Sequence, residues 1–366
     1  MKAEAPDVIV CAGGGGVGKT TTSAALGLAL AASGRRALVV TIDPARRLAG
    51  AMGVAIGDEV TAVPLPAARG NLSALMPDPR RSLSVFIGHL FEHEPEARER
   101  VESNRIYAGL ADAAAGVHEL VAMNLVARAA STGRFDVIVI DTAPSRHAVD
   151  FVTYPGRLAA LLGGRTVGWL AGIAKRGSQG EGAPSAGSGG LLSWGTGRVE
   201  ALIGRVTGPN LFADTASLFG DLAIVRERFV DLTTQASELL LGPRAAYVLV
   251  AAPTGAARND VHYLAHRLEK LGKPLQAIVM NRGGALPDEE LPAGLPPALA
   301  EAATLLREER EARAKAMRAL AEDFRAHFGG LTHMLALPHV EGESPSEVVT
   351  TLAETLGPKL AMFRAS

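Results

Sequence analysis

Nine residues near the start of the chain have the types and spacing that hold a phosphate group. Residues 13–21 read Gly-Gly-Gly-Gly-Val-Gly-Lys-Thr-Thr and directly follow the apolar run 8–12, which matches G-x-x-x-x-G-K-[ST] between a strand and a helix. Glycine lets successive backbone N–H groups point inward around an anion, and a helix over residues 19 to about 32 adds the positive end of its dipole. An ordinary glycine-rich turn is the alternative, but the Lys-Thr pair argues against it. The sequence therefore predicts a phosphate-binding loop.

The side chains of this loop have separate expected roles. Lys19 is expected to reach the β- and γ-phosphates of a nucleotide, and the Thr20 hydroxyl to ligate Mg²⁺. Main-chain N–H groups supply the remaining contacts. The loop residues expected to contact the nucleotide are Gly14, Gly15, Gly16, Val17, Gly18, Lys19, Thr20 and Thr21.

Two aspartates end apolar runs that are typical of buried strands. Asp43 ends the run 37–43 and precedes a proline, so it either orients and deprotonates the attacking water or caps the next helix; both readings stay open. Asp141 follows the run 137–140 and fits a Walker B carboxylate, which holds Mg²⁺ through a water. We therefore expect Thr20, Asp43 and Asp141 around the metal, and Lys19 with the two aspartates as the catalytic set.

The order of apolar and helical segments predicts an α/β protein built on a doubly wound, mostly parallel sheet. Parallel strands that are buried on both faces read as almost continuous apolar runs, and alternation of such runs with helices indicates this layer structure. The phosphate loop would then lie at the carboxyl end of the first strand, where open α/β sheets bind ligands. The expected strands are residues 8–12, 37–43, 136–142, 246–252, 275–281 and 334–338.

Long helical stretches interrupt this alternation. We expect one P-loop ATPase domain over residues 1–366, with helical insertions at 82–132 and 157–241 that form a subdomain. Residues 175–197 within the second insertion are rich in glycine and serine, so they are expected to be mobile. Residues 298–328 are charged and amphipathic, which predicts a further helix.

Composition narrows the function classes. The chain has 366 residues, 48% of them hydrophobic and 20% charged, with a formal net charge of -1, so nucleic-acid binding is not expected. The single cysteine, Cys11, excludes an intrachain disulfide and a multi-thiolate metal site. The first residues lack the apolar core of a signal peptide, which predicts a cytoplasmic protein. The pairs His89/His93 and His262/His266 lack a third ligand, so we expect ordinary histidines there.

The combination of G-G-V-G-K-T-T, D-P-A-R and D-T-A-P, in this order along the chain, resembles a known ATPase family. That family contains the arsenite-efflux ATPase ArsA and the eukaryotic targeting factor for tail-anchored membrane proteins, within a wider class that includes MinD and ParA. The resemblance implies ATP and Mg²⁺ as cofactors and an ATP-driven dimer, with Asp43 activating water and Asp141 near the metal. It also implies that Asn281 and Pro338 contact adenine.

The chain departs from the class at one position that bears on catalysis. Gly14 stands where the class usually has a lysine that crosses the dimer interface to the partner's nucleotide. An uncharged residue cannot stabilise the charge of phosphoryl transfer. Hydrolysis is then slow, or another group such as Arg146 substitutes, or a lysine-bearing sister ATPase pairs with this chain. A C-x-x-C motif is absent as well, so a structural zinc of that type is not expected.

The resulting expectation is a Mg²⁺-dependent ATPase that works as a homodimer or heterodimer. Its helical insertions would couple hydrolysis to a hydrophobic protein client or a membrane partner. One alternative is a positioning ATPase like ParA or MinD that binds a surface. A second is a catalytically weak nucleotide-binding subunit that activates a lysine-bearing partner, which Gly14 favours.

Overall fold

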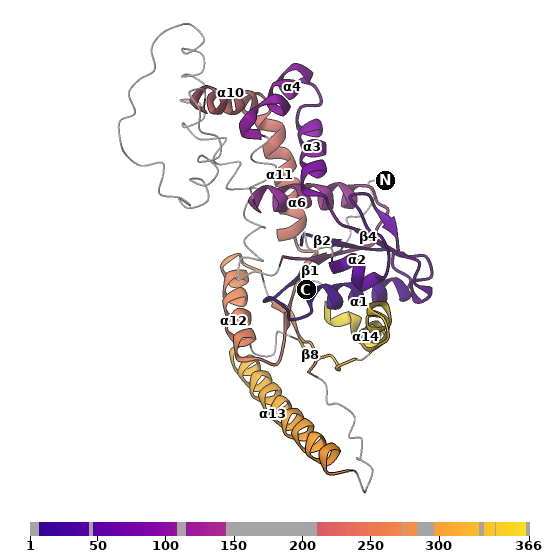
Figure 1. Ribbon diagram of the computed structural model, residues 1–366. Helices are drawn as coiled ribbons and strands as arrows, with labels where there is room; N and C mark the ends of the chain where they lie inside the picture. Colours follow the sequence, from indigo (N-terminus) through magenta and orange to yellow (C-terminus); the bar gives the residue numbers. More distant parts are fainter. Residues whose placement is uncertain are drawn as a thin grey trace, which may run out of the picture. The chain divides into compact units, whose positions relative to one another are not determined.

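Figure 1 shows the computed structural model of the chain, which describes residues 7–43, 47–107, 115–143, 211–273, 275–283, 296–328, 333–340 and 342–363. The chain forms two compact units. The first unit draws on residues 1–77, 128–150 and 239–366, and the second on residues 78–127 and 151–238. Both segments of the second unit therefore interrupt the sequence of the first.

A mostly parallel sheet forms the centre of the first unit. Its strand order is β3-β4-β2-β5-β1-β6-β7-β8, and only the β3–β4 pairing among the described strands is antiparallel. This sheet and its helices confirm the predicted α/β fold. The strands are β1 (Asp7–Ala12), β2 (Ala37–Thr41), β3 (Thr61–Ala62), β4 (Leu72–Leu75), β5 (Val137–Asp141), β6 (Ala245–Ala251), β7 (Leu275–Met280) and β8 (His333–Ala336).

The register of the central strands brings their carboxyl ends together. On β1, Cys11 pairs with Asp141 of β5, and Asp141 in turn pairs with Thr41 of β2. These strands are apolar and buried along almost their whole length, as expected for strands covered on both faces. The polar residues at their ends therefore meet at one edge of the sheet.

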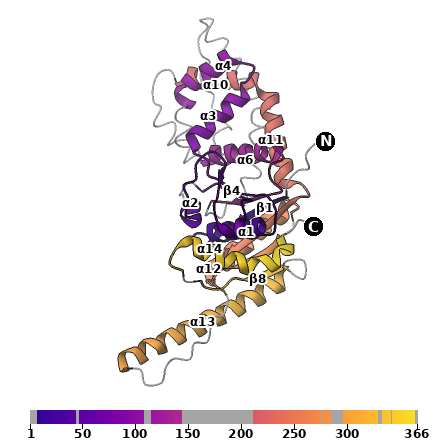
Figure 2. The same ribbon diagram turned by 90° about the vertical axis from the view of Figure 1, so that its right-hand side faces the viewer.

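Helices cover the sheet. Figures 1 and 2 both show α1 and α14 side by side, and the buried leucines Leu26, Leu30 and Leu352 belong to one hydrophobic cluster with Ile9 of β1. The helix α12 packs against β6 and β7, and lies across the sheet from α1 in Figure 1. The helices of this unit are α1 (Lys19–Ala32), α2 (Arg47–Met52), α12 (Gly255–Lys270), α13 (Pro297–Phe328) and α14 (Pro345–Leu356), with the 3₁₀ turns η1 (Pro66–Ala68) and η4 (Gly357–Phe363).

The described part of the second unit is made of helices. Asp78 begins α3 by accepting a hydrogen bond from the Arg81 backbone N–H at 3.0 Å, which is a favoured helix start. The Phe86 and Phe229 rings meet edge to face, with centroids 6.1 Å apart. The helices are α3 (Pro79–Leu90), α4 (Pro95–Ser103), α6 (Ala115–Ser131), α10 (Leu211–Ile224) and α11 (Arg226–Leu241), and the last residues of α6 and α11 belong to the first unit. Among the described residues, no helix has both the length and the apolar character that crossing a membrane requires.

Each strand expected from the sequence forms, but β3 and β4 were not predicted. These two strands have two and four residues, so they are too short to show an apolar run or a clear alternation. The expected helix 298–328 forms as α13. Residues 175–197 lie outside the described part of the chain, and the assignment of residues 1–366 to one domain with a client subdomain stays a prediction.

A close approach of α1 to β2 yields the first testable prediction. A Cβ atom on Gly27 would lie 2.2 Å from the Cγ2 atom of Val39. We expect Gly27→Ala to lower the free energy of unfolding by about 1–3 kcal/mol, because overpacking outweighs the gain in helix propensity. Gly50→Ala in α2 is the matched control, since nothing lies within 4 Å of that added methyl group. Chemical denaturation measures both, and equal stabilisation of the two variants would contradict the prediction.

Candidate nucleotide-binding site

The phosphate loop joins the end of β1 to the start of α1. Gly18 lies just before α1 with a φ of 89°, a left-handed conformation that glycine adopts without strain. A side chain is also excluded there, because a Cβ atom on Gly18 would lie 2.0 Å from Nδ2 of Asn281. The sequence motif therefore matches a backbone shape that only glycine fits at this position.

Lys19 is buried in the loop. The residue is 5% exposed, and its Nζ atom donates a hydrogen bond to the Gly14 carbonyl at 2.7 Å. Burial lowers the pKa of Lys19, while the negative charges of Asp141 and Asp43 oppose this shift. The ammonium group thus lies in the field of both predicted catalytic carboxylates.

Asp141 is fully buried at the end of β5. Its Oδ2 atom accepts a hydrogen bond from the Thr41 hydroxyl at 3.0 Å. Burial raises the pKa of Asp141 to about 6, although hydrogen bonding to Thr20 and Thr41 and the charge of Lys19 lower it. Its Oδ1 atom is buried and has no hydrogen-bond partner within the described part of the chain. A buried carboxylate oxygen of this kind is suited to a metal ion or its water.

Asp43 lies two residues beyond β2 and is 6% exposed. Its Oδ2 atom is 3.3 Å from Nη1 of Arg47, and its backbone N–H donates to the Thr41 hydroxyl at 3.1 Å. Thr41 therefore contacts both aspartates. The alternative role of Asp43 as a helix cap concerns residues 44–46, which are not among those that the structure describes.

Asn281 and Pro338 follow the neighbouring strands β7 and β8. Asn281 is 6% exposed, and its side chain donates a hydrogen bond from Nδ2 to the Val17 carbonyl at 2.9 Å, so it contacts the phosphate loop directly. Leu337, just before Pro338, donates its backbone N–H to the Met280 carbonyl at 2.9 Å, which continues the β7–β8 pairing up to this point. Their expected contact with adenine stays a prediction.

The donors present fit a magnesium ion. Thr20 offers a hydroxyl, and Asp43 and Asp141 offer carboxylates. The buried Oδ1 atom of Asp141 accepts no hydrogen bond from the residues that the structure describes. Hard oxygen ligands of this type, with several coordination positions left to water and phosphate, are those that Mg²⁺ prefers. The arrangement therefore suits a nucleotide triphosphate bound with its metal.

Two residues of this site were missed from the sequence. Thr41 was read only as part of a strand, because its contact with Asp141 depends on a register that the sequence does not display. Asp260 lies in α12, and a Cβ atom on Gly14 would lie 2.4 Å from its Oδ2 atom. The negative charge of Asp260 also opposes the lowering of the Lys19 pKa by burial. The Asp260 carboxylate thus lies where a side chain at position 14 would begin.

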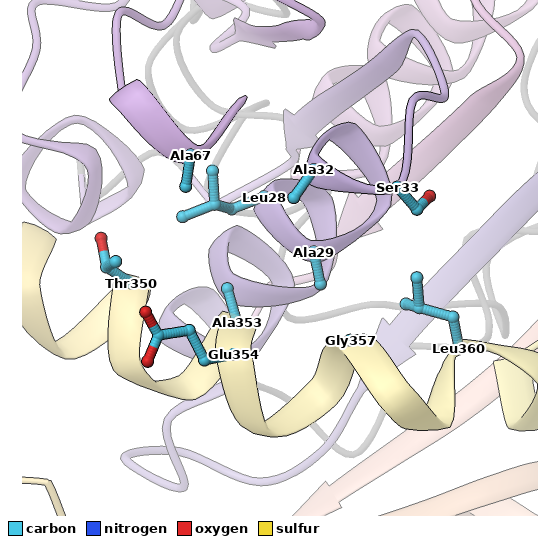
Figure 3. A pocket seen from close by; sticks show the side chains of 10 residues that line it. All are labelled: Leu28, Ala29, Ala32, Ser33, Ala67, Thr350, Ala353, Glu354, Gly357 and Leu360. Carbon is cyan, nitrogen blue, oxygen red and sulfur yellow. The ribbon is translucent and has the colours of Figure 1, made fainter. Parts of the chain in front are cut away.

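A separate cavity of about 300 Å³ lies away from this site. Figure 3 shows that its lining includes Leu28 and Ala32 from the end of α1 that is distant from the phosphate loop, with Ala353 of α14 and Leu360 of η4 opposite. The lining is mostly apolar. The residues that line it include Glu354 and no lysine or arginine, so the cavity does not suit a phosphate group.

The part of the chain that contains the phosphate loop is similar to a known family of ATPases. Residues 7–176 match the family model of the anion-transporting ATPase ArsA. This part of the chain is therefore similar to the ArsA ATPase family. The match includes the phosphate loop, Asp43 and Asp141, and it confirms the resemblance found in the sequence. Asp260, Asn281 and Pro338 lie beyond the matched residues.

Curated proteins similar to this chain are named as ATPases. "ATPase get3" of Schizosaccharomyces japonicus is 32% identical over 158 residues, which is 42% of this chain and 45% of that protein. "ATPase get3" of Aspergillus terreus is 33% identical over 154 residues, or 42% of this chain and 44% of that protein. "ATPase GET3" of Mycosarcoma maydis is 33% identical over 165 residues, or 44% and 47%. The chain thus matches less than half the length of these relatives.

The raised pKa of Asp141 predicts a pH dependence of stability without nucleotide or magnesium. Because its folded pKa of about 6 lies above the ordinary value of 3.8, Asp141 stabilises the fold below about pH 4, and this contribution is lost as pH rises through 6. We expect Asp141→Asn to be more stable than the parent chain at pH 8 by up to about 3 kcal/mol, and nearly equal at pH 4. Denaturation curves in chelator measure this difference.

Asp136→Asn is the control of opposite sign. Hydrogen bonds from Arg36 lower the pKa of Asp136, so its contribution is present above about pH 4 and is lost as pH falls. We expect this variant to be no more stable than the parent chain at pH 8. An Asp141→Asn variant that shows no gain at pH 8 would contradict the burial argument.

Proposed function

We propose that the chain is a Mg²⁺-dependent ATPase of the ArsA type. The observation that supports this most strongly is the meeting of Lys19, Asp43 and Asp141 beside the phosphate loop, with one buried oxygen of Asp141 left without a hydrogen bond among the described residues. The family match over residues 7–176 and the names of the relatives agree with ATP hydrolysis. Adenine binding through Asn281 and Pro338 is part of the proposal.

The residues of the site have distinct roles in the proposed reaction. Backbone N–H groups of the loop bind the phosphate oxygens, and the Lys19 ammonium exchanges the Gly14 carbonyl for the β- and γ-phosphates. Bound Mg²⁺, held through Thr20 and the aspartates, would supply positive charge to the transferring phosphoryl group. Asp43 orients the attacking water and takes its proton. Thr41 holds the carboxylate of Asp141 in place through its hydroxyl.

Similarity to the same family also suggests how ATP hydrolysis would be coupled to a partner. The ATPase would work as a dimer that closes on ATP and opens after hydrolysis, and its second unit would couple this cycle to a hydrophobic protein client or a membrane partner. The second unit supports a partner-binding role, since it is a compact body whose two segments flank the segment that carries Asp141 in the sequence.

Gly14 and Asp260 favour a second form of this function, a subunit with weak activity of its own. A carboxylate lies beside Gly14, within 2.4 Å of where a Cβ atom would be placed. It cannot stabilise the negative charge that develops on the phosphates. The chain would then bind nucleotide and rely on a cation from a lysine-bearing sister subunit.

Single substitutions separate binding from hydrolysis. We expect Lys19→Ala to weaken MgATP binding roughly 10- to 100-fold, the cost of a lost charge-assisted hydrogen bond, while Lys270→Ala at the exposed end of α12 leaves MgATP binding unchanged.

Asp43→Asn should leave MgATP binding nearly unchanged and lower turnover by roughly 10²- to 10⁴-fold, because it removes the general base. Calorimetry with phosphate release measures both. Unchanged MgATP affinity in Lys19→Ala would remove the basis of the proposal.

The weak-subunit form has its own test. We expect slow turnover by the parent chain alone and a rise of at least about tenfold in the double variant Gly14→Lys with Asp260→Ala. In a homodimer of this variant each chain would supply a cation to the nucleotide of its partner, and removal of the Asp260 carboxylate makes room for the lysine. Asp260→Ala alone is the control for the removal of the carboxylate. Fast hydrolysis by the unmodified chain, with no gain in the double variant, would show that Gly14 does not limit the rate.

A further inference from the structure

Three potential metal ligands meet where α12 contacts the end of α13. His262 comes from α12, and Asp323 and His327 lie one turn apart on α13. Each side chain offers one ligand atom, and these atoms lie within 4.8 Å of one another. The sequence suggested His262 and His266 as a pair on one helix face, but Nδ1 of His266 lies 3.4 Å from Oε2 of Glu269. The cluster is therefore formed by the packing of two helices that are far apart in sequence.

Asp323 is held as a carboxylate in this cluster. Arg258 donates to its Oδ2 atom from Nε at 2.9 Å and to Oδ1 from Nη2, and His262 Nε2 lies 2.6 Å from Oδ2. The Asp323 side chain is 13% exposed. A carboxylate has about four lone-pair positions, so Arg258 leaves Asp323 with positions for a metal. Hydrogen bonds to a ligating carboxylate also fix its orientation, which strengthens metal sites.

The hydrogen bonding of His327 determines which of its nitrogens is free. Its Nδ1 atom lies 2.9 Å from the backbone carbonyl of Asp323. A carbonyl only accepts, so Nδ1 carries the proton and the lone pair of a neutral His327 is on Nε2. Ligating histidines commonly donate their other N–H to a backbone carbonyl in this way. The side chain is 55% exposed, which leaves a path for an ion to enter.

We propose that His262, Asp323 and His327 form a binding site for a divalent transition-metal ion of the Zn²⁺ type. Two imidazoles and one carboxylate are a donor set that zinc accepts, with water as the fourth ligand. A tetrahedral ion with bonds of about 2.0–2.1 Å places its ligand atoms about 3.3–3.4 Å apart. The distance from His262 Nε2 to Asp323 Oδ2, now 2.6 Å, would increase by less than about 1 Å. Because all the ligand atoms lie within 4.8 Å of one another, no pair would need to close by more than about 1.5 Å.

The surroundings of His262 support a defined site. Phe324 and Phe328 lie beside its ring, with centroids 5.7 and 5.3 Å away, and the His327 ring is edge-on at 4.6 Å. Aromatic neighbours restrict the imidazole and exclude part of the solvent, which reduces the reorganisation needed on metal binding. The rings thus keep His262 directed toward α13.

An ion at this position would join α13 to the helix that borders the phosphate loop. Asp260, the residue beside Gly14, precedes His262 by two positions on α12. Metal binding would therefore stabilise the segment of α12 that faces the proposed nucleotide site. This role is separate from the Mg²⁺ of hydrolysis, which uses oxygen donors at the sheet edge.

Metal titration of the untagged full chain, stripped with chelator and kept free of nucleotide, tests the site. We expect one Zn²⁺ per chain by calorimetry, and visible absorption bands of tetrahedral cobalt when Co²⁺ replaces it. Excess Mg²⁺ should not compete, because it prefers oxygen ligands. His327→Ala should weaken Zn²⁺ binding at least about tenfold and abolish the rise in melting temperature that Zn²⁺ gives the parent chain.

Matched variants keep the test decisive. His266→Ala, on the same helix and outside the cluster, should bind Zn²⁺ like the parent chain. His262→Gln provides a second ligand variant of similar size, and circular dichroism verifies that each variant folds. Zn²⁺ affinity that is the same in His327→Ala and His262→Gln as in the parent chain, or absence of a one-to-one site in the parent chain, would overturn the proposal. MgATP binding is measured in parallel, and its outcome does not depend on this result.

Discussion

The burial of opposite charges at one edge of the sheet is the constraint on which the site depends. Asp141 and Lys19 have almost no contact with water. Burial raises the pKa of Asp141 and lowers the pKa of Lys19, so in both residues it favours the neutral form. Charges of this kind are retained in a fold only when partners compensate for the lost hydration. In this chain they compensate each other in part, and Thr41 adds a hydrogen bond. A metal ion and an anionic phosphate would complete that compensation, which is why the arrangement fits a nucleotide.

The parallel register determines which side chains take part. Cys11, Asp141 and Thr41 stand side by side on three adjacent strands, so the polar residues at the ends of β2 and β5 reach the same point as the loop after β1. Antiparallel neighbours would place their opposite ends there. Crossover connections return the chain to the opposite edge before the next parallel strand begins, which keeps the carboxyl ends together. The proposed chemistry is therefore a consequence of topology as well as of residue type.

The second half of the chain completes the surroundings of the loop. Asn281 holds the Val17 carbonyl from β7, and Asp260 approaches Gly14 from α12, yet both lie beyond the residues that match the family model. The same helix carries His262, which contacts Asp323 on α13. One rigid helix thus connects the edge of the proposed nucleotide site with α13. The surroundings of the loop therefore depend in part on residues that lie beyond the family match.

The amino-acid sequence was sufficient to predict the fold class, which the structure confirms, and to name Lys19, Asp43 and Asp141 as candidates for one site. An apolar strand followed by a glycine-rich loop and Lys19 is a local pattern, and so are aspartates at the ends of apolar runs; local patterns can be read because their geometry is set by residues close together in the chain. The expected strands and the helix 298–328 were confirmed for the same reason. Only the tertiary structure decided that Thr41 bonds to Asp141, that Asp260 lies beside Gly14, and that His262 meets α13 instead of acting with His266. These contacts join segments far apart in sequence, and they depend on strand register and helix packing, which no single segment encodes.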